Sequence, residues 1–198
     1  GEADYVMLWA AVILTAISAA ELVFKSEFRL IKKTDVNQFS IYNLIKFSDI
    51  FTLGNMLFGL AAIFFAINKN YLAMSASLFL AVIADYLDGK LAKKLGQETI
   101  FGKELDSLAD TISFGVAPAI FGFSLIQTNL AIFSFAIFMF CGILRLARYN
   151  IMDIKGGYEG MPITLNGIII PILFFLKIPA DFYPYIYILL GILMVSNV

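Results

Sequence analysis

The sequence contains no histidine and only one cysteine among its 198 residues. The absence of histidine excludes histidine general bases, histidine-containing catalytic triads and zinc sites with histidine ligands. Cys141 cannot form a disulfide within the chain, and its apolar neighbours favour a packing role. The remaining ligand chemistry is that of carboxylate oxygens, which suits magnesium, manganese or calcium ions.

Charge is also scarce, since charged residues make up 15% of the chain and the net charge is −1. This balance excludes a generic basic surface for nucleic acid. Apolar residues make up 61% of the sequence, and the mean hydropathy is +0.87, whereas soluble domains are roughly 45–50% apolar. The apolar runs approach the 20 or so residues that a membrane-spanning helix needs, and they lack the alternation of a β-barrel. The chain is therefore predicted to be an integral membrane protein.

The predicted fold is an all-α, polytopic membrane helix bundle in two parts. Residues 1–46 are expected to form an N-terminal hydrophobic helix and then a juxtamembrane amphipathic helix on the inner leaflet. A re-entrant helix and a basic linker are the alternatives for these two segments. Residues 47–198 are expected to form a transmembrane core of six helices. The seven apolar segments are 5–24, Asp49–Ile67, Tyr71–Leu95, 103–125, Asn129–Ile151, 162–176 and 182–198.

The basic residues predict the orientation of the bundle. If the segment Asp49–Ile67 starts in the cytoplasm, twelve of the fourteen lysines and arginines lie on the cytoplasmic side. Only Lys69 and Lys177 then lie outside. This bias agrees with the positive-inside rule and predicts a multi-pass protein of the cell membrane.

Four aspartates are the most informative residues of the chain. Asp85 and Asp88 are three residues apart, and Asp106 and Asp110 are four apart, so each pair shares one face of a helix. Each carboxylate at the centre of a membrane would cost about 2.5–3.5 kcal/mol, so the cluster is expected to face a wet cavity and to hold cations. Two divalent ions shared by these carboxylates would form a site that can clamp a diphosphate. Isolated ion pairs at helix ends are the alternative for any one of these residues.

Neighbouring residues agree with a diphosphate ligand. Gly89 allows a ligand to approach the helix backbone, and Gly102 lies near the start of the next helix, where the amides favour an anion. Lys93 lies one turn beyond Gly89 and adds a positive charge on the same side.

The run from Asp85 to Asp110 resembles the signature of the CDP-alcohol phosphatidyltransferases, Asp-x2-Asp-Gly-x2-Ala-Arg-x8-Gly-x3-Asp-x3-Asp. The chain departs from it at Lys93, where the family usually has arginine, and lysine lacks the bidentate fork. Three later motifs are similar to the membrane-integral phosphatidylserine synthases of bacteria and archaea. They begin at Ser113, Arg145 and Tyr158 and read Ser-Phe-Gly-Val-Ala-Pro, Arg-Leu-Ala-Arg-Tyr-Asn and Tyr-Glu-Gly-Met-Pro.

The resemblance implies transfer of a phosphatidyl group from a CDP-linked lipid to L-serine, with release of CMP. It implies two Mg2+ or Mn2+ ions held by Asp85, Asp88, Asp106 and Asp110, with Asp110 also the catalytic base. The residues implied at the CDP-lipid are Thr52, Asn55, Gly89, Lys93, Thr99 and Gly102. Candidates for the acceptor are Arg145, Arg148 and Asn150, of which the arginines suit the serine carboxylate. Homodimers are common in this family.

Three other functions are compatible with part of this pattern. The same fold could use glycerol phosphate or inositol phosphate as the acceptor. A cation transporter would explain aspartates within the membrane but not the adjacent glycines and lysines. A prenyltransferase would need two aspartate motifs on well-separated helices.

Overall fold

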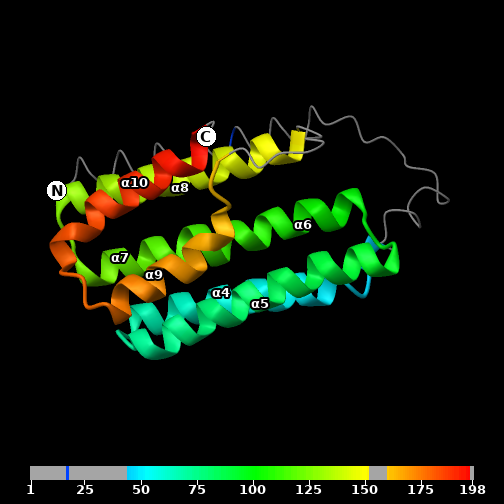
Figure 1. Ribbon diagram of the computed structural model, residues 1–198, viewed down its shortest axis with the longest axis horizontal. Coiled ribbons are helices and arrows are strands. Elements are labelled where there is room, and N and C mark those ends of the chain that lie inside the picture. The colour runs from blue at the N-terminus through cyan, green and yellow to red at the C-terminus, as the bar shows by residue number, and fades with distance from the viewer. Residues whose placement is uncertain (1–16, 18–43, 152–159, 197–198) are drawn as a thin grey trace. The chain divides into compact units, whose positions relative to one another are not determined.

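The computed structural model describes residues 17, 44–151 and 160–196, and within them every regular element is a helix (Figure 1). Four helical segments are long and apolar enough to cross a membrane: Asp49–Ile67, Tyr71–Leu95, Ile100–Leu125 and Asn129–Ile151. Two shorter apolar segments, Ile163–Phe175 and Ala180–Val195, follow them. The prediction of an all-α, multi-pass membrane bundle is confirmed. The predicted N-terminal hydrophobic helix and amphipathic segment lie almost entirely outside the described residues.

The first two core helices, α4 (Asp49–Ile67) and α5 (Tyr71–Leu95), form a closely packed hairpin (Figure 1). Its short turn is closed by Asn70, whose side chain accepts a hydrogen bond from the Ala73 amide at 3.2 Å. Small buried residues such as Ala62 and Ala81 allow close approach of helices. This hairpin returns the end of α5 to the same end of the bundle as the start of α4.

The third span consists of α6 (Ile100–Asp110), the π-helical segment η1 (Thr111–Val116) and α7 (Ala117–Leu125). It begins three residues earlier than predicted, because the Thr99 side chain accepts the Gly102 amide at 2.9 Å and caps the helix. Gly96 ends α5 in the left-handed conformation, with φ of 62°, so a short connection joins α5 to α6. The π-helical turn separates Asp110 from Pro118, which has no amide hydrogen to continue an α-helical ladder.

The remaining helices pack around the first three spans. Helix α8 (Asn129–Ile151) packs against α10 (Tyr183–Val195), and α9 (Asn166–Phe175) contacts α5. Short 3-10 turns, η2 (Ile163–Leu165) and η3 (Ala180–Phe182), precede α9 and α10. The Tyr187 ring lies edge-on to Phe135 and Phe138, and its hydroxyl donates to the Pro118 carbonyl. Tyr187 therefore connects α10 to both α7 and α8.

Large apolar side chains cover much of the outside of these helices. Leu57, Phe64, Phe133 and Phe140 are each more than 60% exposed, as suits contact with lipid chains. Buried polar side chains, by contrast, recur on the first three spans, at Asp49, Thr52, Asn55, Asp88, Asp110 and Ser113. These residues surround the candidate site.

Candidate active site

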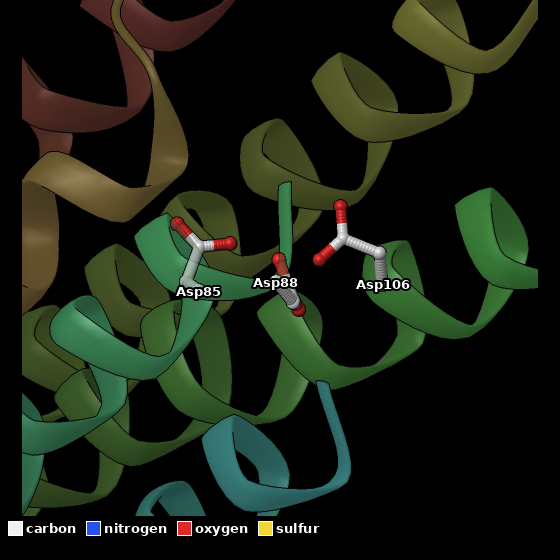
Figure 2. A group of neighbouring side chains, drawn as sticks. All are labelled: Asp85, Asp88 and Asp106. Atoms are coloured by element: carbon white, nitrogen blue, oxygen red, sulfur yellow. The ribbon is translucent and has the colours of Figure 1, made fainter. Parts of the chain in front are cut away.

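Helices α5 and α6 bring Asp85 and Asp88 of the first predicted pair close to Asp106 of the second (Figure 2). One carboxylate oxygen each from Asp85, Asp88 and Asp106 lies within 4.8 Å of the other two. The helical spacing that predicted this convergence is therefore correct for these three aspartates, and the fourth, Asp110, contacts Asp85. Such a separation allows the three oxygens to share one cation.

The carboxylates of this cluster have unused acceptor positions. Asp88 is only 5% exposed, and neither its Oδ2 atom nor the Oδ1 atom of Asp106 has a hydrogen-bond partner among the described residues. Buried carboxylate oxygens are normally paired, because desolvation of an unpaired charge is costly. A divalent cation would satisfy both oxygens, so this donor set fits a metal ion.

Asp110 lies one turn beyond Asp106 on α6 and faces Asn55 of α4. It is 6% exposed, and its Oδ1 atom accepts a hydrogen bond from the Asn55 side-chain amide at 3.0 Å. Its carboxyl group also contacts Asp85, which in turn contacts the Thr164 side chain from the segment before α9. Asp85 therefore connects Asp88 and Asp106 to Asp110.

A cleft of about 560 Å3 opens beside Asp88 and Asp106. It is bounded by the start of α4, the end of α5 and the start of α6. Five residues predicted at the CDP-lipid line it: Thr52, Gly89, Lys93, Thr99 and Gly102. The structure thus places Lys93, two glycines and two of the metal-ligand candidates around a single space large enough for a nucleotide.

The two glycines of the cleft differ in what they allow. A side chain at Gly89 would meet nothing within 4 Å, so glycine leaves this wall open to a ligand. A Cβ atom at Gly102 would lie 3.1 Å from Asp49 Oδ1 and 3.2 Å from Thr99 Oγ1, which is tight packing. Gly102 thus lets the start of α6 approach the start of α4.

Asn55, the sixth residue predicted at the CDP-lipid, does not line the cleft. It is fully buried on α4, where its side chain contacts Asp110. Thr52 and Asn55 are three residues apart on α4, but their side chains meet different aspartates, since Thr52 lies against Asp88.

The predicted acceptor residues lie near the end of α8, outside the walls of the cleft. The Asn150 amide donates to Ser107 Oγ at 3.0 Å and to Glu104 at 3.3 Å, which ties α8 to α6. The Arg148 guanidinium is 3.5 Å from the Val195 carbonyl of α10. The Arg145 guanidinium lies 5.9 Å from the centre of the Tyr149 ring, and Tyr149 does line the cleft.

Several lining residues were missed by the sequence analysis. Ser48, Asp49, Gln97, Glu98, Ile100 and Lys103 also border the cleft. Asp49 is 3% exposed and accepts the Lys46 amide at 2.8 Å. Its position one helical turn before Thr52 was a usable signal, whereas Gln97 reaches the cleft only through the tertiary fold.

Residues 46–196 match the sequence profile of the CDP-alcohol phosphatidyltransferases. The chain belongs to this family. A CDP-alcohol phosphatidyltransferase uses a divalent metal, and the Asp85, Asp88 and Asp106 oxygens offer a site for one.

Individual members of the family resemble the chain over most of its length. The CDP-diacylglycerol–serine O-phosphatidyltransferase of Methanocaldococcus jannaschii is 39% identical over 162 residues, which cover 81% of this chain and 76% of the relative. The archaetidylserine synthase of Methanothermobacter thermautotrophicus is 34% identical over 172 residues, covering 82% and 72%. A CDP-diacylglycerol–serine O-phosphatidyltransferase of Bacillus subtilis is 36% identical over 128 residues, covering 63% and 72%.

Proposed function

We propose that this chain transfers the phosphatidyl group of a CDP-linked lipid to L-serine and releases CMP. The observation that carries the proposal is the convergence of the Asp85, Asp88 and Asp106 oxygens beside a nucleotide-sized cleft that also contains Lys93. The names of the three relatives support serine as the acceptor. Both an ester donor, CDP-diacylglycerol, and its archaeal ether equivalent, CDP-archaeol, fit this chemistry.

The donor diphosphate would lie in the cleft between α4, α5 and α6. Lys93 is exposed there and adds positive charge, and the open wall at Gly89 leaves room for the ligand. Thr52 and Thr99 contribute side-chain hydroxyls. The start of α6 faces the same space, where the helix dipole favours an anion.

Asp85, Asp88, Asp106 and Asp110 would hold two Mg2+ or Mn2+ ions, which, when bound, neutralise the diphosphate and stabilise charge on the departing CMP. Asp88 and Asp106 face the cleft, whereas Asp85 and Asp110 lie on the side that contacts Thr164. This division supports an acceptor side of the site at Asp85 and Asp110.

Asp110 would act as the base. A serine hydroxyl is weakly acidic, so its attack on phosphorus needs a carboxylate that accepts its proton. The serine Oγ–P bond forms as the P–O bond to CMP breaks, with the two oxygens roughly in line, and the proton passes to Asp110. Asp110 suits this role because the Asn55 side chain holds one of its oxygens in a fixed position.

Arg145 is the strongest of the three candidates for the serine carboxylate, because it stacks on Tyr149, a residue of the cleft wall. Arg148 and Asn150 would then hold the end of α8 in place through α10 and α6. We further propose that the site faces the cytoplasm of the cell membrane, within a homodimer.

Release of CMP by purified protein, measured with a panel of acceptors, tests the serine assignment. We expect turnover with CDP-lipid and L-serine, and none when serine is replaced by glycerol phosphate or inositol phosphate. Turnover with either phosphate and not with serine would reject serine as the acceptor but keep the reaction class.

A further inference from the structure

Asn55 lies beneath the aspartates and away from the cleft. Its side chain is fully buried, and it donates from Nδ2 to Asp110 Oδ1 at 3.0 Å. Fifty-five residues separate the two partners in the sequence, so this contact exists only because α4 packs against the end of α6. A nucleotide in the cleft would not meet this side chain, since the residues that line the cleft do not include it.

The orientation of the Asn55 side-chain amide follows from its neighbour, the Asp110 carboxyl group. The Asn55 Oδ1 atom is buried and has no hydrogen-bond partner among the described residues. The reversed amide would direct a carbonyl oxygen at the Asp110 carboxylate, so the observed orientation is the one that avoids repulsion. The amide thus satisfies Asp110 while its own carbonyl oxygen has no hydrogen bond within the described part of the chain.

The backbone of Asn55 is fixed by the π-helical turn that follows Asp110. Ser113 donates from Oγ to the Asn55 carbonyl at 3.0 Å, and both residues are fully buried. Gly59, one turn further along α4, has no side chain to separate the two helices here, since a Cβ atom would lie 2.7 Å from Ser113 Cα. Asn55 is therefore held on both sides, through its side chain by Asp110 and through its carbonyl by Ser113.

We infer that Asn55 is a positioning residue for Asp110, and not a contact to the nucleotide. Its N–H group holds Asp110 Oδ1 and so fixes the orientation of the carboxyl group that accepts the proton of the attacking hydroxyl. The inference depends on the proposed role of Asp110 as the base. A fixed carboxylate lowers the reorganisation that proton transfer requires. Removal of the Asn55 amide is therefore expected to reduce turnover and to leave the affinity for the CDP-lipid donor unchanged.

Steady-state kinetics of Asn55→Leu and Asn55→Asp test this inference. Leucine preserves most of the volume and removes the donor, and aspartate preserves the shape and places a carboxylate opposite Asp110. We expect kcat to fall roughly 100-fold or more in both variants, in the range for general acid–base catalysis, while KM for the CDP-lipid stays within about twofold. Asn68→Leu is the matched control, because Asn68 lies exposed at the far end of α4 and bonds only its own helix; it should keep wild-type kinetics.

An increase of KM for the CDP-lipid with unchanged kcat would overturn the inference and restore Asn55 as a nucleotide contact. Thermal unfolding with and without CDP-lipid separates a folding defect from a positioning defect, because a folded variant still shows the ligand-induced shift. If Asn55→Leu fails to fold, Asn55→Asp decides. The kinetics use whichever acceptor supports CMP release, so rejection of serine leaves the test of Asn55 intact. If no acceptor supports release, the proposed function fails, and weakened CDP-lipid binding by Asn55→Asp would still overturn the inference.

Discussion

At the residue scale, the four aspartates occupy two environments. Asp88 and Asp106 border the cleft and have oxygens without hydrogen-bond partners among the described residues, whereas Asp110 is enclosed and bonded to Asn55. Asp85 contacts Asp110 and Thr164 between these two environments. Residues of the same type, on two adjacent helices, are therefore suited to different tasks.

This difference predicts distinct effects of two isosteric substitutions. Asp110→Asn should reduce turnover by at least about 100-fold, because an amide cannot accept the hydroxyl proton, while much of the CDP-lipid binding remains. Asp88→Asn should weaken metal and CDP-lipid binding together, because it removes a ligand at the cleft wall. CMP release together with CDP-lipid binding measured by thermal shift would distinguish the two. Equal loss of donor binding in both variants would remove the separate role of Asp110 as base.

Helical spacing was enough to predict that Asp85, Asp88 and Asp106 converge, since residues three or four apart share a face. It could not predict the partner of Asn55, because that contact depends on how α4 packs against a helix more than 50 residues away. It could not place Arg145, Arg148 and Asn150 either. Arg145 meets Tyr149 one turn along its own helix, whereas the contacts of Arg148 with Val195 and of Asn150 with Ser107 follow from the packing of α8 against α10 and α6.

At the scale of elements, the contact between α4 and the π-helical segment η1 determines where Asp110 lies. Gly59 meets Ser113 at this contact, and Ser113 bonds the carbonyl of Asn55. The apolar pattern predicted the third span, but it contains no signal for the π-helical turn that precedes Pro118. The turn arises where the third span must both present Asp110 and accommodate a proline.

Gly59→Ala should push α4 and η1 apart. The added methyl group would meet the Ser113 backbone, so that α4 or η1 must move, and we expect lower thermal stability together with a loss of turnover. Gly54→Ala is a matched control on the same helix, because its Cβ atom would meet nothing within 4 Å. Alanine there should maintain activity and raise stability slightly, by up to about 1 kcal/mol. Wild-type stability and turnover in Gly59→Ala would show that the contact does not hold the site.

At the scale of the whole molecule, the hairpin of α4 and α5 and the return through α6 place the aspartates at one end of the spans, with Lys93 and Lys103 beside them. The number of core helices was predictable from the apolar runs alone, since each run is bounded by polar turns. The orientation is a proposal based on the distribution of lysine and arginine. If it holds, water-soluble serine reaches the site from the cytoplasm, and the lipid donor reaches it from the inner leaflet.

Cysteine labelling tests this orientation. Cys141→Ser removes the native cysteine, and single cysteines are then introduced by Lys94→Cys, near the end of α5, or Gln127→Cys, between α7 and α8; both positions are exposed. An impermeant maleimide should label position 127 in intact cells and position 94 only in inverted membrane vesicles. The reverse pattern would place the aspartates on the outer side.

The central claim is that the aspartate site passes a phosphatidyl group from a CDP-linked lipid to serine. The most direct test follows radiolabelled L-serine into lipid, with purified protein in vesicles that contain CDP-diacylglycerol or CDP-archaeol. We predict label in the organic phase with one CMP released per labelled lipid, loss of both after chelation of divalent ions, and recovery when Mg2+ or Mn2+ is restored. Asp110→Asn should transfer no label under the same conditions. Transfer that is unaffected by chelation, or a wild-type protein that binds the CDP-lipid and metal but never labels the lipid, would contradict this account.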